Sequence, residues 1–525
     1  MTEQKLTRHQ WLICFVLLAT IVALHAWSLM RFPAPSVDEA WLISRAWAFA
    51  RTGRAFGPLD AGIADRFEGA WVVNQWLITA LQSLALRPFP VPSLLAVRGL
   101  ALLWGSILLA ANYWIAHRMG GRSLALVSTL LLALSRAFFY SAHSSRYDIM
   151  AAALGYLAIA LILNDGASRF WVNVLAGLAV GLAVETHLNS LIFGPVILAL
   201  YWLEEGWLTL RKARFWGFVV GATVGLGIYL ALHVLPYPQT FFNLNRMLFG
   251  ADHKPPFLTP SLEGILEVFV TTGNLMLAAS ASSSVLALAA IPILINRRSE
   301  SAKRLWVSSV ALITGAALLI PNKTGHYAIL LAPAVLWLVA AFLLEFLKQP
   351  WRGQWRDYAS RVLIWGLVAG SIALSLASLR EDSYSDYRRV QSNIDQTVRS
   401  GDKIMASQTY WLGLYDHTYY SWELLFLYPR VFPGKTMADA FQEYRPDLFV
   451  IDGDMNDLIS DTIDPSSRWS NYHLPRAELF AYLEKHARQV ATFEADVYGT
   501  VRVYRLNWAG EASLGTEAAW GLPSP

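Results

Sequence analysis

Two adjacent carboxylates, Asp38 and Glu39, follow the first apolar run of the chain, Trp11 to Met30, by a few residues. Ionisable side chains are costly near hydrocarbon, so a pair kept there indicates chemistry. Such a carboxylate can act as a general base that takes the proton of an attacking hydroxyl group. The same pair could instead be ordinary first-turn acids of a helix that Ser36 caps. We predict that Asp38 is the base. Neighbouring helical residues point about 100° apart, so one acid should face a cavity and the other a neighbouring span.

Three further stretches place ionisable side chains at the ends of apolar runs. Arg146 and Asp148 could simply pair with each other, and His187 could be a hydrogen-bonded histidine between helices. Lys323 lies in a short loop where the positive-inside bias disfavours a cation, which favours a functional role. The residues that we expect at one membrane face are Asp38, Glu39, Arg146, Asp148, Glu185, His187, Lys323, His326 and Tyr327.

The composition indicates a polytopic membrane protein. Of 525 residues, 55% are hydrophobic and 15% charged, and the mean hydropathy is +0.38. The net charge of +4 is too small to indicate a nucleic-acid partner, and a single cysteine, Cys14, excludes an internal disulfide. The first apolar run is long for a signal peptide and lacks a small-residue cleavage pattern, so we interpret it as a retained span.

Eleven spans are expected from apolar runs long enough to cross about 30 Å of hydrocarbon. The basic N-terminus predicts a cytoplasmic start, which places Asp38 outside, and the loops predicted inside are nearly all basic. After the first span, the runs are 94–116, 123–141, 147–163, 170–186, 189–205, 215–235, 276–295, 305–320, 328–347 and 362–379.

The sequence predicts three parts: a transmembrane domain (1–379), an α/β domain (380–508) and a disordered tail (509–525). The outer loop 31–90 should carry two interfacial helices, 37–52 and 67–85, around a turn at 57–62. Trp422 to Phe432 is interpreted either as membrane-facing or as a core strand. In the α/β domain, helices are expected at 387–399, 438–444 and 476–488, and strands at 402–407, 447–452, 489–493 and 501–506.

The chain resembles the GT-C superfamily of integral-membrane glycosyltransferases, in the bacterial branch related to protein O-mannosyltransferases and aminoarabinose transferases. The resemblance covers roughly residues 10–350. Each motif is weak alone, but the set is specific because the motifs occur in order. The C-terminal domain, with its stretch Arg445–Asp452, is similar to the domains that many family members carry. The motifs are Asp38–Ala40, Ala96–Leu100, Ser145–Met150, Gly181–Ala183, and Lys323–Tyr327 followed by Leu330–Pro333. Two segments depart from the family. Residues 70–76 lack the His/Lys-Pro-Pro stretch, and Thr186-His187 replaces Thr-Lys, which leaves the sugar and the acceptor open.

The resemblance implies an all-α membrane domain of GT-C type with an extracytoplasmic C-terminal α/β domain. It implies transfer of a sugar from a polyprenyl-phosphate donor to an acceptor hydroxyl or amine at the extracytoplasmic face. A single base without a second carboxylate as nucleophile predicts inversion at the anomeric carbon. Growing charge on the leaving phosphate needs cations and hydrogen-bond donors. The site expected on this basis has Asp38 and Glu39 as catalytic residues; Lys323, Arg146, His326 and Tyr327 at the donor phosphate; and Asp148 and His187 in the substrate cavity.

No metal-ligand cluster occurs in the sequence, although Asp38 and Asp148 together could hold a divalent cation. The expected partners are the lipid-linked donor, a lipid, glycan or protein acceptor, and membrane lipids. The expected location is the plasma or inner membrane, with a cytoplasmic N-terminus. Two other functions stay open, a lipid or solute transporter and a non-catalytic membrane scaffold. A transporter would place charges near the midplane between repeats, and neither pattern is found in the sequence.

Overall fold

A computed structural model of the chain separates into two compact units, Met1–Arg389 and Val390–Pro525. The division falls within helix α16 (Ser383–Asp395). The structure describes residues 8–54, 56–62, 64–164, 169–249, 290–292, 294–295, 299–320, 325–348, 355–377, 379, 383–459 and 473–508. Lys323, most of the expected span 276–295 and the expected tail 509–525 lie outside these residues.

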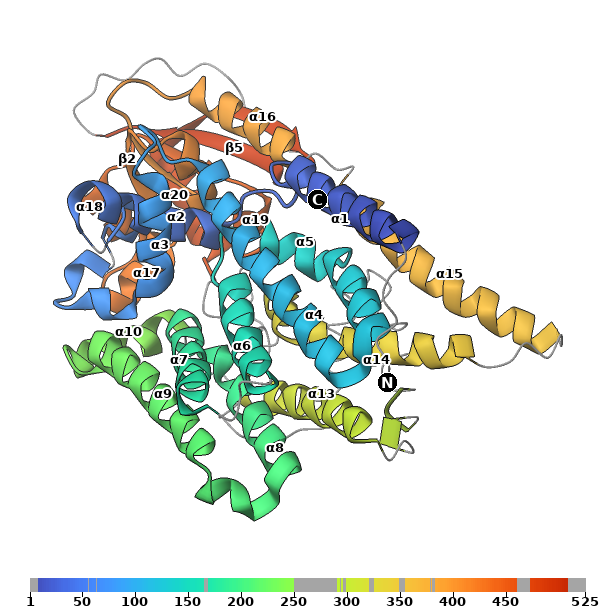
Figure 1. The fold of residues 1–525 in the computed structure, drawn as a ribbon. Coiled ribbons are helices and arrows are strands. Elements are labelled where there is room, and N and C mark those ends of the chain that lie inside the picture. The colour runs from blue at the N-terminus through green and yellow to red at the C-terminus, as the bar shows by residue number, and fades with distance from the viewer. Residues whose placement is uncertain are drawn as a thin grey trace. The chain divides into compact units, whose positions relative to one another are not determined.

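The first unit is helical (Figure 1). Five of its described segments are long and apolar enough to cross a membrane: Leu94–Ala133, Leu188–Arg211, Ala213–Val234, Glu300–Leu319 and Ala328–Lys348. Shorter apolar helices accompany them, so the chain is a multi-pass membrane protein, and the total of eleven spans stays a prediction. The helices are α1 (Arg8–Ser28), α2 (Val37–Thr52), α3 (Trp76–Leu86), α4 (Leu94–Ala133), α5 (Arg136–Ala142), α6 (Asp148–Ile162), α7 (Phe170–Thr186), α8 (Phe193–Glu205), α9 (Ala213–Tyr229), α10 (Pro238–Phe249), α13 (Glu300–Leu319), α14 (Ala328–Lys348) and α15 (Trp355–Ala377).

Helix α4 is a hairpin of two helical arms. Gly121 has φ 83° and ψ −176°, a conformation that glycine adopts readily. The Asn112 amide donates to Thr129 Oγ1 at 2.8 Å, whereas 17 residues of straight helix would separate them by about 25 Å. The two expected spans 94–116 and 123–141 are therefore distinct arms. The second was predicted too long, because the helix ends at Ala133 and Ser135 caps a new helix, α5.

Helices α7 and α9 lie side by side (Figure 1) and approach closely at glycines. A Cβ atom on Gly221 would lie 2.0 Å from Val174 O, and one on Gly225 would lie 2.5 Å from Gly181 Cα. Small residues spaced four apart allow this contact between helix backbones in membranes. The sequence analysis identified both helices but not this packing.

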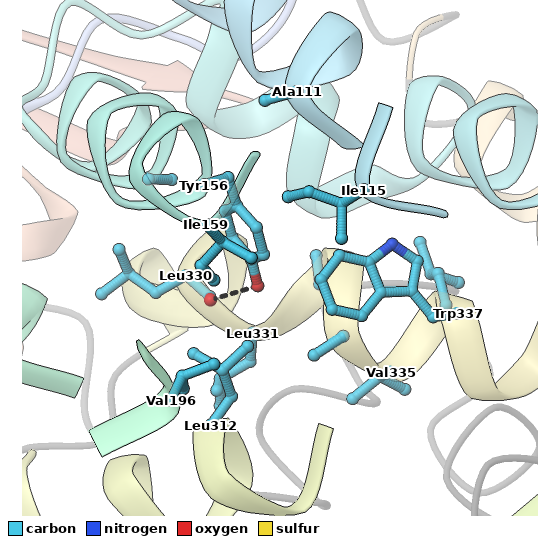
Figure 2. Close-up of a cluster of buried hydrophobic side chains, with 14 of the residues drawn as sticks. Ala111, Ile115, Tyr156, Ile159, Val196, Leu312, Leu330, Leu331, Val335 and Trp337 are labelled. Atoms are coloured by element: carbon cyan, nitrogen blue, oxygen red, sulfur yellow. Dashed lines mark hydrogen bonds between the residues drawn. The ribbon is translucent and has the colours of Figure 1, made fainter. Parts of the chain in front are cut away.

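Helix α14 runs through the core of the unit. Figure 2 shows its side chains among those of α4, α6, α8 and α13. The indole N–H of the fully buried Trp337 donates to Asn112 Oδ1 at 2.7 Å, and Tyr156 donates to Leu330 O at 2.9 Å. These bonds satisfy polar groups inside an apolar core and fix α14 against α4 and α6.

The outer-loop helices were predicted in part. The helix expected at 37–52 is α2. The helix expected at 67–85 begins only at Trp76, because Ala70–Val73 forms a 3-10 turn and the backbone is extended at Asn74. The turn expected at 57–62 contains the 3-10 segment Pro58–Asp60, which the buried Arg45–Asp60 ion pair (2.8 Å) ties to α2.

The second unit is built on a five-stranded mixed sheet with strand order β2-β1-β3-β5-β4. Strands β2, β1 and β3 are parallel, with Ile404 opposite both Tyr419 and Leu448, and β3, β5 and β4 are antiparallel. The strands are β1 (Lys403–Ala406), β2 (Thr418–Ser421), β3 (Leu448–Ile451), β4 (Ala487–Ala495) and β5 (Gly499–Leu506), and the helices are α17 (Leu424–Val431), α18 (Met437–Tyr444), α19 (Gly453–Asn456) and α20 (Arg476–His486).

The four expected strands and three expected helices of this unit are present, with bounds shifted by a few residues. Strand β2 was not predicted. The prediction of a core strand within Trp422–Phe432 was wrong, because this run forms helix α17. A short continuous apolar run has no periodicity that separates a buried strand from a buried helix.

Candidate active site

A chain of three charged side chains joins α2 to the start of α6. The Arg146 guanidinium donates through Nη1 to Asp38 Oδ2 and through Nε to Asp148 Oδ2, the latter at 2.8 Å. Arg146 and Asp148 are 3% exposed, whereas the Asp38 side chain is 47% exposed. Arg146 and Asp148 thus form a buried ion pair, and this pair holds the accessible Asp38 carboxylate in place.

Asp38 is placed by the N-terminus of α2. The Ser36 hydroxyl accepts a hydrogen bond from Glu39 N at 3.3 Å, so Ser36 is the N-cap and both acids occupy the first turn. Negative charge is favourable there because the free N–H groups of a helix start carry partial positive charge. The capping interpretation therefore holds and does not conflict with a chemical role for Asp38.

Glu39 points into the protein instead. Its carboxylate is fully buried and forms a two-point ion pair with Arg98, with Nε to Oε1 at 3.0 Å and Nη2 to Oε2 at 2.8 Å. Oε1 also accepts from Ser145 N at 2.7 Å. One acid of the pair is accessible and the other contacts a neighbouring span, as expected from the helical geometry, and Glu39 connects α2 to α4 and to the segment before Arg146.

The backbone that presents Arg146 is fixed on several sides. Ser145 O and Oγ both accept from Gln82 Nε2 of α3, at 2.9 and 2.7 Å. His143 contacts His25 (2.9 Å between Nε2 and Nδ1) and Phe32 O (3.1 Å from Nδ1). The turn that carries the arginine is therefore held by α1, α2 and α3 together.

Three aromatic rings lie next to Arg146. Tyr147 stacks on His187 at 4.6 Å between ring centres, and His187 packs against Tyr327 at 4.9 Å. Tyr147 and Tyr327 also share a hydrogen bond. Asn189 N donates to His187 Nδ1 at 3.1 Å, which places the imidazole proton on Nε2. Burial lowers the pKa of His187 to about 4, so the ring is neutral near pH 7.

The loop before α14 reaches the same place. His326 packs against Tyr140 at 5.2 Å, and Tyr327 belongs to the aromatic stack described above. Burial raises the pKa of Tyr327, which keeps its hydroxyl protonated and able to donate. Of the expected site residues, the structure thus brings together Asp38, Arg146, Asp148, His187 and Tyr327, with His326 on the adjacent Tyr140; Lys323 lies outside the described residues.

A small pocket opens beside Arg146 between α3, α4 and α6. Its volume is about 10 Å³, which is room for about one water molecule, and Arg146, Gln82 and Ser145 provide its polar lining. The rest of the lining is apolar: Ile78, Val97, Leu100, Ala101, Trp104, Ile149 and Met150. The cavity therefore has apolar walls next to a guanidinium group, but it has no room for a ligand larger than water.

Solved structures share this architecture. The crystal structure of ArnT from Cupriavidus metallidurans bound to undecaprenyl phosphate aligns with 97% of this chain and 100% of its own, at 13% identity and a TM-score of 0.60. The apo form of ArnT aligns with a TM-score of 0.56, at 13% identity over 94% of this chain and 98% of its own. The oligosaccharyltransferase of Archaeoglobus fulgidus aligns with a TM-score of 0.51, at 11% identity over 96% of this chain and 76% of its own.

The chain has the GT-C fold. At 11–13% identity these matches show a shared fold only. They confirm the fold that the sequence motifs had predicted. No protein-family model matches the chain, and no curated protein matches its sequence.

The divalent cation considered for Asp38 and Asp148 does not fit this site. The Arg146 guanidinium lies between the two carboxylates and bonds to both. Among the described residues, no group of three His, Cys, Asp or Glu side chains is placed to hold a metal ion. A cation at this point would have to compete with the arginine for the same oxygens.

Several residues at or near the site were not assigned a role from the sequence. Arg98 is a charged residue inside an apolar run, which was a usable signal for a buried ion pair. Glu185 was expected at the same membrane face. It accepts from Leu77 N at the start of α3, at 3.1 Å, and lies 3.5 Å from His233 Nε2. No sequence pattern marks Gln82 or Tyr140 as a site residue, and only the three-dimensional structure shows that they lie beside the site.

Proposed function

We propose that this GT-C chain transfers a sugar from a polyprenyl-phosphate donor to a hydroxyl or amine of an acceptor at the extracytoplasmic face of the membrane. The observation that carries the proposal is the accessible Asp38 carboxylate held by the buried Arg146–Asp148 pair. It combines a base and a cation at the end of membrane helices, as displacement of a phosphate by a hydroxyl group requires.

Asp38 acts as the general base. Arg146 holds Oδ2, and no hydrogen bond among the described residues uses Oδ1. The acceptor oxygen attacks the anomeric carbon, its proton passes to Asp38, and the bond from that carbon to the phosphate oxygen breaks with the electron pair leaving on the phosphate. Because a single base acts and no second carboxylate serves as nucleophile, the configuration at the anomeric carbon inverts. Glu39 positions this base through Arg98.

Arg146 receives the leaving phosphate. An arginine has five N–H donors, of which the described contacts use two, one to each aspartate. The remaining donors can bind phosphate oxygens as negative charge grows on them. Lys323, His326 and Tyr327 complete the phosphate site in this proposal, and His187 and Asp148 line the sugar cavity.

For the lipid part of the donor to lie next to Arg146, the apolar side chains of α3, α4 and α6 that line the small pocket would have to separate. Support for a lipid phosphate comes from the neighbour of the same fold, since the ArnT crystal structure is of a complex with undecaprenyl phosphate. The positive-inside distribution of basic loops supports the extracytoplasmic side, and the membrane in question is the plasma or inner membrane.

The test uses purified protein in lipid nanodiscs with undecaprenyl-phosphate-linked sugars as donors. Loss of donor and release of undecaprenyl phosphate are measured for wild type, Asp38→Asn and the control Asp65→Asn, which changes an exposed aspartate of the same loop region. We expect Asp38→Asn to lower turnover by roughly 10²–10⁴-fold with an unchanged melting temperature, and Asp65→Asn to have no effect. Equal turnover in Asp38→Asn and wild type would contradict the assignment of the base.

A further inference from the structure

The second unit has polar side chains at the carboxyl ends of its parallel strands that no described residue satisfies. Gln408 is 1% exposed, and neither its Oε1 nor its Nε2 has a hydrogen-bond partner. Trp411 is fully buried, and its indole N–H is also without a partner. Leaving a buried polar group unpaired is costly, so three such atoms within four residues point to a bound group that pairs with them.

The topology places these atoms where sheets of this kind bind ligands. Strand β1 pairs with β2 on one side and with β3 on the other, all three parallel. The chain continues from β1 to β2 on one side of β1 and later to β3 on the other side, so the strand order reverses between β1 and β3. The carboxyl ends of these two strands, called the β1–β3 edge below, therefore form a topological switch point. In open α/β sheets, ligands bind outside the carboxyl ends of the strands at such a point.

Residues from both strands meet at this edge. Gln408 follows β1 by two residues, and Asp452 follows β3 directly. The Tyr410 hydroxyl donates to Asp452 Oδ2 at 2.9 Å, and Met455 N donates to Oδ1 at 2.9 Å. Ionised carboxylates offer about four acceptor positions, so Asp452 keeps acceptor capacity after these two bonds.

We propose that the β1–β3 edge of the C-terminal unit is a binding site for a sugar ring or a similar polyhydroxylated group, held by Gln408, Trp411 and Asp452. A hydroxyl group donates one hydrogen bond and accepts others, so neighbouring sugar hydroxyls pair with an amide that both donates and accepts, an indole donor and a carboxylate acceptor. The Tyr410 and Tyr498 rings, 5.7 Å apart, add aromatic surface for the C–H face of a sugar.

The buried position of the site constrains how a ligand enters. Gln408 and Trp411 belong to the 3-10 segment Gln408–Gly413, which lies between β1 and β2. Because both side chains are covered, the ligand has to displace neighbouring residues before it binds. Association should therefore be slower than diffusion permits and should reach a limiting rate at high ligand concentration.

The site is independent of the proposed transfer reaction, and its test needs no donor. The full-length protein in detergent is titrated calorimetrically with the methyl glycosides of glucose, galactose, mannose, arabinose and N-acetylglucosamine. We expect at least one glycoside to bind wild type, and Gln408→Leu to weaken that binding at least tenfold, as loss of one or two buried hydrogen bonds implies. The matched control is Gln442→Leu, an exposed glutamine of the same unit, which should bind as wild type does.

Melting temperatures separate the proposal from a purely structural role. Without ligand, Gln408→Leu should be at least as stable as wild type, because it removes an unpaired buried amide. Trp411→Phe, which keeps a ring and removes the N–H, provides a second variant should Gln408→Leu fail to fold. Two results would overturn the proposal: no glycoside binds wild type, as expected if only a buried water pairs with Gln408, or a glycoside binds wild type and both variants equally.

Discussion

Glu39 and Arg98 form a two-point ion pair with no exposed surface, at 3.0 and 2.8 Å. The pair joins the first turn of α2 to α4, and Glu39 also accepts from Ser145 N. Asp38 directly precedes Glu39 in the chain, and Arg146 directly follows Ser145, whose N–H binds the Glu39 carboxylate. This connection fixes their distance through the backbone.

Removing one partner of this pair should destabilise the protein strongly. Glu39→Ala leaves the Arg98 charge buried without its partner, which costs about 3–5 kcal/mol. The measurement is denaturant-induced unfolding of the first unit in detergent micelles. The double variant Glu39→Leu/Arg98→Met removes both charges and should recover most of that loss. If the single variant were as stable as wild type, the pair would have no structural role.

Arg146→Lys tests whether the arginine bridge is specific. A lysine ammonium keeps the charge but is a single point, and it cannot hold two carboxylates in the fixed geometry of a guanidinium group. We expect donor turnover to fall about 10²–10³-fold, the range seen when one donor to a developing oxyanion is lost. Folding should be retained, and nanodisc assays with undecaprenyl-phosphate sugars measure the change. Turnover within twofold of wild type would show that charge alone suffices.

The sequence was informative where hydropathy or a charge next to an apolar run decides the structure. Asp38, Arg146 and His187 were identified because ionisable groups at span ends are rare, and the structure brings them together. Helix α2 was predicted with its bounds because Ser36 and the acids after it mark a helix start. These signals are local, so one sequence suffices to recognise them.

Features that depend on contact between distant segments were not predictable. The break at Ser135 and the close approach of α7 and α9 depend on which helices are neighbours. The pairing of Glu39 with Arg98 required knowing that the start of α2 lies beside α4. Strand β2 has the sequence Thr-Tyr-Tyr-Ser and lacks the aliphatic residues that mark the equally short strands β1 and β3.

His187 should make stability depend on pH. Burial lowers its pKa from 6.5 to about 4, so the folded state favours the neutral ring. The stability that this provides is complete above pH 6.5 and is lost as the pH falls towards 4, with a total of about 3 kcal/mol. His187→Phe keeps the ring stack with Tyr147 and removes the titration. The free energy of unfolding, measured for both proteins from pH 7.5 to 4.5, should fall less for His187→Phe; parallel curves would contradict the shift.

Asp452 should act in the opposite direction in the second unit. Burial raises its pKa from 3.8 to about 6, with the neighbouring Asp454 adding to the shift. The folded state thus favours the protonated acid, and the associated stability is complete below pH 3.8 and lost as the pH rises through 6. Asp452→Asn stays neutral and should be more stable than wild type at pH 7.5, with a smaller difference at pH 4.5. A constant difference across that range would contradict it.

The glycine contact between α7 and α9 makes a prediction with a control on the same helix. Gly221→Ala places a Cβ atom 2.0 Å from Val174 O, so the two helices must separate. Overpacking of this kind costs about 1–3 kcal/mol. Gly227 lies six residues further along α9, and a Cβ atom there would have nothing within 4 Å. Gly227→Ala should be neutral or slightly stabilising because alanine favours helix. Thermal melting in detergent measures both variants. Since α7 ends at Thr186, directly before His187, Gly221→Ala should also lower donor turnover. Equal stability of the two variants would show that the helices are not packed as described.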